Sequence, residues 1–311
     1  MSAGTIPASM AIVVGPPPGG GPAQPRGHDR RTRRLALLLV FGAWLAFVAP
    51  AFSGKARFPV DFAGPPPGQE ARPLLNPELG DAYYAMYPWH AYLGRRLAAG
   101  EVPLWDPHRF AGTPFAANSA PGVWYPPNWL YASGHVLFAF TAIAVASLLA
   151  ALLLAYWFLR VLRLHPFACA LGAVVFAFSA GLIRYSSNEP VFGSTMWLPL
   201  ALGGLEVARQ GRPRRGVAMA AVGLALSVLA GHAQIALCVW LVTAMWAATC
   251  LVASARVPRD RPGLAPRLRA VAGAAVPVGL AFVLAGGLAA VQLLPTAAFA
   301  GEIVRQETSF A

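Results

Sequence analysis

Residues 80–131 read GDAYYAMYPWHAYLGRRLAAGEVPLWDPHRFAGTPFAANSAPGVWYPPNWLY, and this stretch determines how the rest of the chain is interpreted. It mixes acidic, basic, amide and aromatic side chains, including four of the nine tryptophans, whereas long apolar runs precede and follow it. A membrane protein places its chemistry in a polar, aromatic loop of this kind, held between membrane-length apolar segments. We therefore expect residues 54–134 to form a large loop that carries an active site outside the membrane.

The composition of the chain excludes an ordinary soluble domain. Of its 311 residues, 57% are hydrophobic and only 12% are charged, against about a quarter charged in soluble globular proteins. Apolar runs near the length that crosses a bilayer recur along the chain. They occupy residues 35–52, 135–159, 167–184, 191–208, 217–231, 235–253 and 271–294. The sequence therefore predicts an all-α polytopic membrane protein with about seven transmembrane helices and a large, partly helical first outer loop.

The N-terminal segment has two parts. Residues 1–34 are rich in Pro, Gly and Ala and end in five arginines, a composition that predicts a disordered basic tail. The apolar run 35–52 resembles the core of a secretory signal peptide, but its 18 residues exceed the about 7–15 that such a core has. We favour a retained first helix, which divides the chain into a cytoplasmic tail, 1–34, and a transmembrane domain, 35–311.

The basic residues occupy alternate connectors between the apolar runs. The tail and the connectors around 160–163, 209–215 and 256–269 carry sixteen basic and three acidic residues, a net charge of +13, whereas the other connectors have a net charge of −1. The positive-inside rule places the basic connectors in the cytoplasm and the loop 54–134 outside. Orientation and contact with anionic lipid explain the total charge of +12, so nucleic acid is not an expected partner.

The first part of the loop has the periodicity of an interfacial helix. From Asp81 to Ala99, Tyr83, Met86, Tyr87, His90, Leu93 and Leu97 fall on one face, and an aromatic stripe of this kind is typical of a helix in the membrane interface. Pro88 divides the segment into a turn and a longer helix, and Gly100 is suited to end it. Asp106, in the sequence PLWDP, is expected to bond backbone amides in a turn.

Three stretches together resemble the YfhO-type bacterial membrane proteins. They are the loop from Asp81 through YPWHAYLGRRLAAGEVPLWDPHRFAGTPFAAN to WYPPNWLY, the turn GHAQ at 231–234, and VQLLPTAAFAGEIVR at 291–305. These proteins resemble the GT-C class of glycosyltransferases, multi-spanning enzymes that take a sugar from a polyprenyl-phosphate carrier outside the membrane. Because members of the family are usually much longer, the chain is expected to be an N-terminal portion of a longer protein.

The resemblance implies a site built around an acid in the first outer loop. Asp81 matches that position and would act as the base that removes the proton of an acceptor hydroxyl; the alternative for Asp81 is a helix N-cap. The charge that develops on the lipid phosphate would be met by arginines or by a divalent cation. Glu189 is a candidate second acid or metal ligand, and an ordinary surface-loop residue is the alternative. The remaining candidates for substrate binding are Arg95, Arg96, Arg109, Asn118, Arg184, His232 and Gln234.

Several alternatives stay open at this point. Each arginine could be an interfacial anchor, and His232 and Gln234 could only stabilise their turn. The histidines at 90, 108 and 135 lack the spacing of a metal site, so metal dependence is unknown. A transporter, a lipid flippase or a non-catalytic envelope scaffold would also be polytopic. The expected partners are membrane lipids and a polyprenyl-phosphate sugar, and the expected location is the bacterial cytoplasmic membrane.

Overall fold

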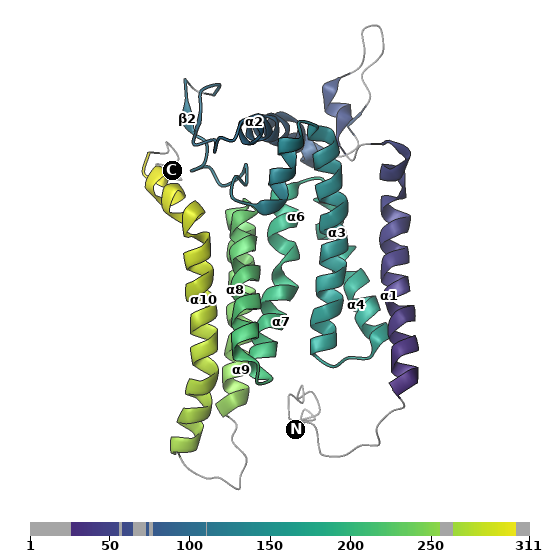
Figure 1. Cartoon of the computed structure of the whole chain (residues 1–311), viewed down its shortest axis with the longest axis vertical. Helices are drawn as coiled ribbons and strands as arrows, with labels where there is room; N and C mark the ends of the chain where they lie inside the picture. The colour runs from purple at the N-terminus through teal and green to yellow at the C-terminus, as the bar shows by residue number, and fades with distance from the viewer. Residues whose placement is uncertain are drawn as a thin grey trace, which may run out of the picture.

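The computed structural model describes residues 26–55, 58–64, 73–74, 77–109, 111–255 and 264–302. Within these ranges the chain is mostly α-helical, and its long helices run side by side (Figure 1). Residues 77–134 gather at one end of this bundle, which we call the loop end. The connectors 162–165 and 210–212 lie at the opposite end, which we call the arginine end. This arrangement bears out an all-α membrane protein with a large, partly helical first loop.

Five helical segments are long and apolar enough to cross a membrane, which supports location in a membrane. They are built from α1 (Arg26–Val48) with η1 (Ala49–Ser53), α3 (Val136–Val161), α6 (Glu189–Met196) with α7 (Leu198–Arg209), α9 (Ala233–Ala255) and α10 (Leu264–Ala300). Many of their large apolar side chains are exposed, as expected of surfaces that face lipid.

Two of the seven predicted spans do not form a single helix of the length that crosses a bilayer. The run 167–184 forms α4 (Pro166–Ala177), a break at Phe178 and Ser179, and α5 (Ala180–Arg184). Ser179 has the extended backbone (φ −57°, ψ 145°) that separates the two helices. The run 217–231 forms α8 (Pro213–Leu229), which has 17 residues. Five spans are therefore supported by length and composition in the described ranges, and the count of seven stays a prediction.

The first helix begins earlier than the sequence predicted. Residues up to 25 lie outside the described part of the chain, but α1 starts at Arg26, so residues 26–34 are helical and do not belong to a disordered tail. Arginine is a good helix former. The basic run can therefore extend the helix by about two turns beyond its apolar part.

Glycines allow α7 and α8 to pack backbone against backbone. A Cβ on Gly204 would lie 2.4 Å from the amide nitrogen of Ala220, and a Cβ on Gly216 would lie 2.3 Å from that of Ala208. Gly223 would meet the amide nitrogen of Ala201 at 2.9 Å. Small residues at helix crossings permit this close approach in membrane proteins, where van der Waals contact drives association.

The loop end is built from short elements around one helix. A π-helical turn, η4 (Ala82–Met86), leads into α2 (Tyr87–Ala98), which lies across the top of the bundle in Figure 1. The other elements are η2 (Val60–Ala63), η3 (Pro77–Leu79), the strands β1 (Trp105–Asp106) and β2 (Thr113–Pro114), and η5 (Pro126–Ser133). The strands pair antiparallel, with Trp105 opposite Pro114 and Asp106 opposite Thr113.

The predicted end of α2 is confirmed. Gly100 has a φ of +75°, the amide of Glu101 donates to the Arg96 carbonyl, and the amide of Gly100 donates to that of Leu97. This pair of bonds is a Schellman motif, which favours glycine at the left-handed position. The buried face of α2 includes Met86, His90 and Leu93, as predicted, whereas Tyr87 is exposed. The π-turn before Tyr87 inserts an extra residue per turn and shifts the expected stripe.

One side-chain hydrogen bond shapes the loop, and a set of hydrogen bonds from α10 attaches the loop to the bundle. The carboxylate of Asp106 accepts a bond from the His108 amide (2.9 Å), which confirms the predicted turn. At the end of α10, the amide group of Gln292 donates to the Ala116 carbonyl (3.1 Å) and to the hydroxyl oxygen of Thr296 (2.9 Å). The Thr296 hydroxyl in turn donates to the Ala117 carbonyl (2.7 Å). Side chains of α10 thus satisfy loop carbonyls that would otherwise lack partners.

Candidate functional site

Asp81 lies at the start of the π-turn on the loop end. Its side chain is exposed, and it makes no capping hydrogen bond to the helix that follows. The capping alternative therefore finds no support in the geometry. The carboxylate is instead presented to solvent at the edge of the loop, which a general base needs in order to meet a substrate hydroxyl.

Aromatic rings surround the beginning of this helix. The ring of Phe62 stacks on Tyr83 (centroids 6.3 Å apart, 24° between planes) and meets Tyr84 edge-on (5.7 Å), while Phe58 contacts both Tyr83 (5.9 Å) and Tyr87 (5.4 Å). Tyr84 remains 64% exposed. Rings of this kind offer an apolar body with a polar tip, which suits a sugar face or the lipid headgroup region.

The arginines predicted to bind substrate are not gathered around Asp81. Arg95 and Arg96 lie at the far end of α2, about 20 Å from Asp81 at the helical rise of about 1.5 Å per residue. Both are exposed, and Arg96 forms an ion pair with Glu101 (2.5 Å). Arg109 lies over the ring of Trp89, 4.7 Å from its centroid. One small sugar phosphate cannot touch both ends of α2, so Arg95 and Arg96 belong to a different part of the surface from Asp81.

The other predicted residues take local structural positions. The side chain of Asn118 accepts a bond from the Ala120 amide (3.1 Å) and closes a turn. Arg184 is exposed at the last residue of α5. His232 accepts a bond on Nδ1 from the Ile235 amide (3.3 Å), which is a capping contact at the start of α9, and Gln234 is exposed.

The turn 231–234 nevertheless lies against the first loop, through its backbone. The contact runs through Gly231, where an added Cβ would lie 2.5 Å from the Ser119 carbonyl oxygen and 3.1 Å from that of Ala120. Gly231 also has a φ of +105°, so glycine is required there twice over. The side chain of His232 serves its own turn, and the backbone makes the contact with the loop.

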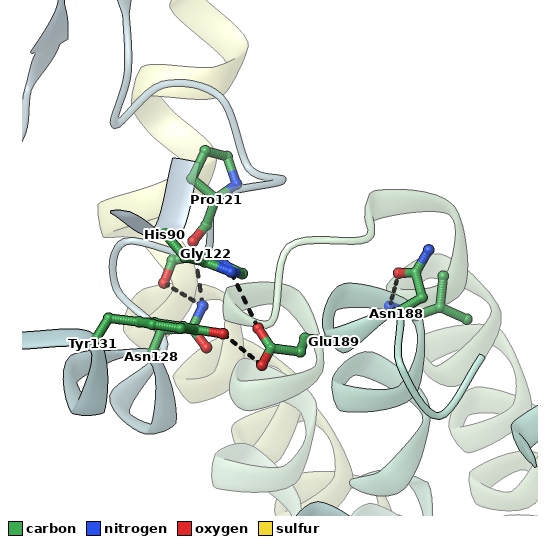
Figure 2. A network of polar contacts seen from close by, with 8 residues as sticks. His90, Pro121, Gly122, Asn128, Tyr131, Asn188 and Glu189 are labelled. Carbon is green, nitrogen blue, oxygen red and sulfur yellow. Dashed lines mark hydrogen bonds and ion pairs between the residues drawn. The ribbon is translucent and has the colours of Figure 1, made fainter. Parts of the chain in front are cut away.

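Glu189 forms a buried contact with the loop that joins three elements (Figure 2). The Tyr131 hydroxyl, on η5, donates to Glu189 Oε1 at 2.6 Å. His90 Nδ1, on α2, lies 3.3 Å from Glu189 Oε2, and both side chains are almost completely shielded from solvent. The rings of His90 and Tyr131 stack, with centroids 4.3 Å apart and 13° between their planes. The surface-loop alternative for Glu189 is therefore wrong, because its carboxyl group lies inside the protein.

Burial sets the charge of the groups around Glu189. Burial lowers the pKa of His90 to about 3, with the nearby backbone of Pro121 opposing the shift, so the imidazole is neutral at physiological pH. Burial and the neighbouring Glu189 raise the pKa of Tyr131 well above its usual value. Tyr131 therefore keeps its proton and acts as a hydrogen-bond donor to the carboxyl group.

Some polar atoms in this cluster have no hydrogen-bond partner among the described residues. They include Nε2 of His90, Oε2 of Glu189 and Oδ1 of Asn128. The amide group of Asn128 is itself engaged, since it donates to the carbonyls of Pro121 and Gly122, both at 3.2 Å. Buried polar groups without partners are costly, so the cluster does not maximise the stability of the fold.

Sequence reasoning missed His90, Tyr131, Gln292 and Thr296. His90 counted only as part of an aromatic stripe, and Tyr131 only as an interfacial ring. The usable signal was the acid at 189, since a carboxylate at the start of an apolar run requires a buried partner.

Within the described residues no group of three or more His, Cys, Asp or Glu side chains could hold a metal ion. A search against protein-family models, curated proteins and solved structures found no match to this chain.

Proposed function

We propose that the protein is a membrane glycosyltransferase of the GT-C type, a member of the YfhO-like family. It would transfer a sugar from a polyprenyl-phosphate donor to an envelope or lipid-linked acceptor at the loop end. The observation that carries this proposal is Asp81, an exposed carboxylate with no capping bond, beside an exposed aromatic cluster at the loop end. A carboxylate with aromatic rings beside it has the chemistry for holding a sugar and removing a hydroxyl proton.

In the proposed reaction the acceptor oxygen attacks the anomeric carbon of the donor sugar. The bond from that carbon to the phosphate oxygen breaks, the electron pair leaves with the lipid phosphate, and the hydroxyl proton passes to Asp81. The described residues offer no three-ligand metal cluster, so we assign no step to a divalent cation. Arg109 and Arg184 are the proposed contacts for the phosphate, since guanidinium groups bind two phosphate oxygens at once.

The proposal requires the loop end to face outward from the bacterial cytoplasmic membrane. A chain that crosses seven times fits this orientation. The five long segments supply five crossings, α4 and α5 together form the sixth, and α8 forms the seventh. The side chains of Arg160, Arg209, Arg212, Arg214 and Arg215 belong to the arginine end, and basic connectors favour the cytoplasm. The N-terminus would then be cytoplasmic.

Transport is less well supported by the same residues. A transporter typically carries charged side chains or broken helices at mid-membrane. The buried acidic side chains of the described spans are Glu189 and Glu206. Glu189 is the first residue of α6, and Glu206 lies in the last turn of α7. Both lie at the ends of the segment that could cross the membrane, so no buried acid marks a path through it. The interruptions between α4 and α5 and between α6 and α7 fit either function.

The test is genetic and chemical together. Deletion of the gene should remove or shorten an envelope glycan, and wild type should restore it. Asp81→Asn keeps the size of the side chain but lowers its proton affinity, so transfer should fall about 10²-fold or more with an unchanged protein level. Glu101→Gln, which neutralises another exposed acid of the same loop, is the matched control and should restore the glycan. Equal losses of folded protein and transfer in Asp81→Asn would make Asp81 a structural residue.

A further inference from the structure

We propose that Glu189 is a positioning residue, whose buried carboxyl group fixes α2 and η5 on the bundle and thereby sets where Asp81 lies. Only the last step of this proposal, from the position of Asp81 to sugar transfer, rests on the proposed function. The fixing of α2 and η5 is a property of the fold and can be measured without any substrate.

One carboxyl group serves two elements of the loop at once. Oε1 accepts the hydroxyl of Tyr131 at 2.6 Å, and Oε2 lies 3.3 Å from Nδ1 of His90. The stacked rings of His90 and Tyr131 bring the two contacts together (Figure 2). Removal of Glu189 would therefore leave the buried Tyr131 hydroxyl on η5 without its acceptor, and it would take away the polar neighbour of Nδ1 of His90 on α2.

The position of Glu189 is transmitted along a rigid path. At Gly94, an added Cβ would lie 2.4 Å from the carbonyl oxygen of Tyr131, so α2 rests directly on the backbone of η5. His90 is separated from Asp81 by nine residues of continuous π- and α-helix, which corresponds to about 13 Å. The helix is continuous between the two residues, so we expect a shift at His90 to displace the exposed carboxylate at its start.

Burial argues against a direct role of Glu189 in binding substrate. Its side chain is 4% exposed and that of His90 is fully buried, so a sugar or a lipid phosphate cannot reach the carboxyl oxygens in this arrangement. The Tyr131 hydroxyl needs an oxygen acceptor, and the neutral imidazole of His90 needs a polar neighbour. Neither contact requires a negative charge on residue 189. Glutamine offers the same carbonyl oxygen and nearly the same shape, whereas leucine offers neither.

The experiment compares Glu189→Leu and Glu189→Gln by hydrogen exchange in the full chain, purified in detergent. Glu189→Leu should speed the exchange of amides in 82–98 and 126–133 about tenfold or more. Glu189→Gln should remain within a few-fold of wild type. Exchange in α8 reports whether each variant is folded. Should Glu189→Leu fail that criterion, Tyr131→Phe removes only the hydroxyl and should give a smaller increase in the same two segments.

Transfer measurements add a readout that a merely structural defect would not produce. Glu189→Leu should lower kcat with little change in KM for the donor, and Glu189→Gln should restore most of the loss. Unchanged exchange in Glu189→Leu would overturn the proposal. So would a Glu189→Gln variant that exchanges like wild type but has lost transfer, since the carboxylate would then act directly. If wild type itself shows no transfer, the proposed function fails, and the exchange data still decide whether Glu189 fixes the loop.

Discussion

The hydroxyl of Tyr131 and the carboxyl group of Glu189 meet at 2.6 Å across 58 residues of sequence, in a position shielded from solvent. The first belongs to the loop that precedes α3, and the second begins α6. A second attachment joins the same loop to α10, where Gln292 and Thr296 hold the carbonyls of Ala116 and Ala117. These two attachments lie at separate points of the loop, and we expect that each can be loosened without affecting the other.

The stability of the cluster should depend on pH through His90. Its pKa falls from 6.5 to about 3 on burial, so between these values the unfolded chain binds a proton that the folded chain does not. The contribution of His90 to the free energy of unfolding must therefore decrease as the pH falls through this window, by up to about 1.4 kcal/mol per pH unit. Melting temperatures of wild type and His90→Gln, measured in detergent from pH 7 to pH 4, test this. The wild type should lose more, and identical pH dependence of the two proteins would contradict it.

The attachment to α10 should control the segment around Ala116 alone. Thr296→Val keeps the size of the side chain and removes the donor to the Ala117 carbonyl, together with the acceptor for Gln292. Exchange of the amides in 115–118 should rise several-fold, while exchange in α2 should not change.

A second threonine supplies the control for that experiment. The Thr249 hydroxyl donates to the carbonyl of Trp246 within its own helix, so Thr249→Val should leave the loop as in wild type. If Thr296→Val also loosened α2, the two attachments would be one unit and the separation described above would be wrong.

The packing of α7 on α8 should be sensitive to a single methyl group. In Gly204→Ala the new Cβ would lie 2.4 Å from the Ala220 amide nitrogen, so the helices must move apart, at a cost of about 1–3 kcal/mol. At Gly286 nothing lies within 4 Å of an added Cβ, and alanine is the better helix former. Gly286→Ala should therefore melt at or slightly above the wild-type temperature and Gly204→Ala several degrees below it. Equal melting temperatures would show that α8 adjusts without cost.

Local features of the fold could be read from the sequence because they depend on neighbouring residues. The periodicity of 81–99 predicted the helix, Gly100 predicted its end, and Asp106 predicted a turn. All three features depend on hydrogen bonds between residues close in sequence. The break between α4 and α5 was missed, since the run 167–184 contains no proline and its one charge, Arg184, lies at its end. The early start of α1 was missed because arginines were assigned to the tail on composition alone.

The candidate site depends on tertiary contacts, which the sequence indicates only indirectly. Asp81 was found from its place in the loop and the resemblance of its surroundings. The contacts of Glu189 with His90 and Tyr131 join residues from three elements, and no regular spacing along the chain predicts them. The arginines were grouped by charge, but α2 separates Arg95 and Arg96 from Asp81 by its own length.

The orientation of the bundle is the prediction on which the assignment of an outer site depends. Cysteine labelling in intact cells can measure it, after the native Cys169, Cys238 and Cys250 are replaced by alanine. Tyr84→Cys lies at an exposed position of the loop end, and Arg214→Cys lies at an exposed position of the arginine end. A membrane-impermeant maleimide should label the first in intact cells, and it should label the second only after the membrane is permeabilised. The +13 net charge of the N-terminal tail and the basic connectors is the physical reason, because translocating them would oppose the positive-inside preference. Labelling of Arg214→Cys in intact cells would invert the protein in the membrane and place Asp81 in the cytoplasm, where a polyprenyl-phosphate donor presented on the outer face cannot reach it.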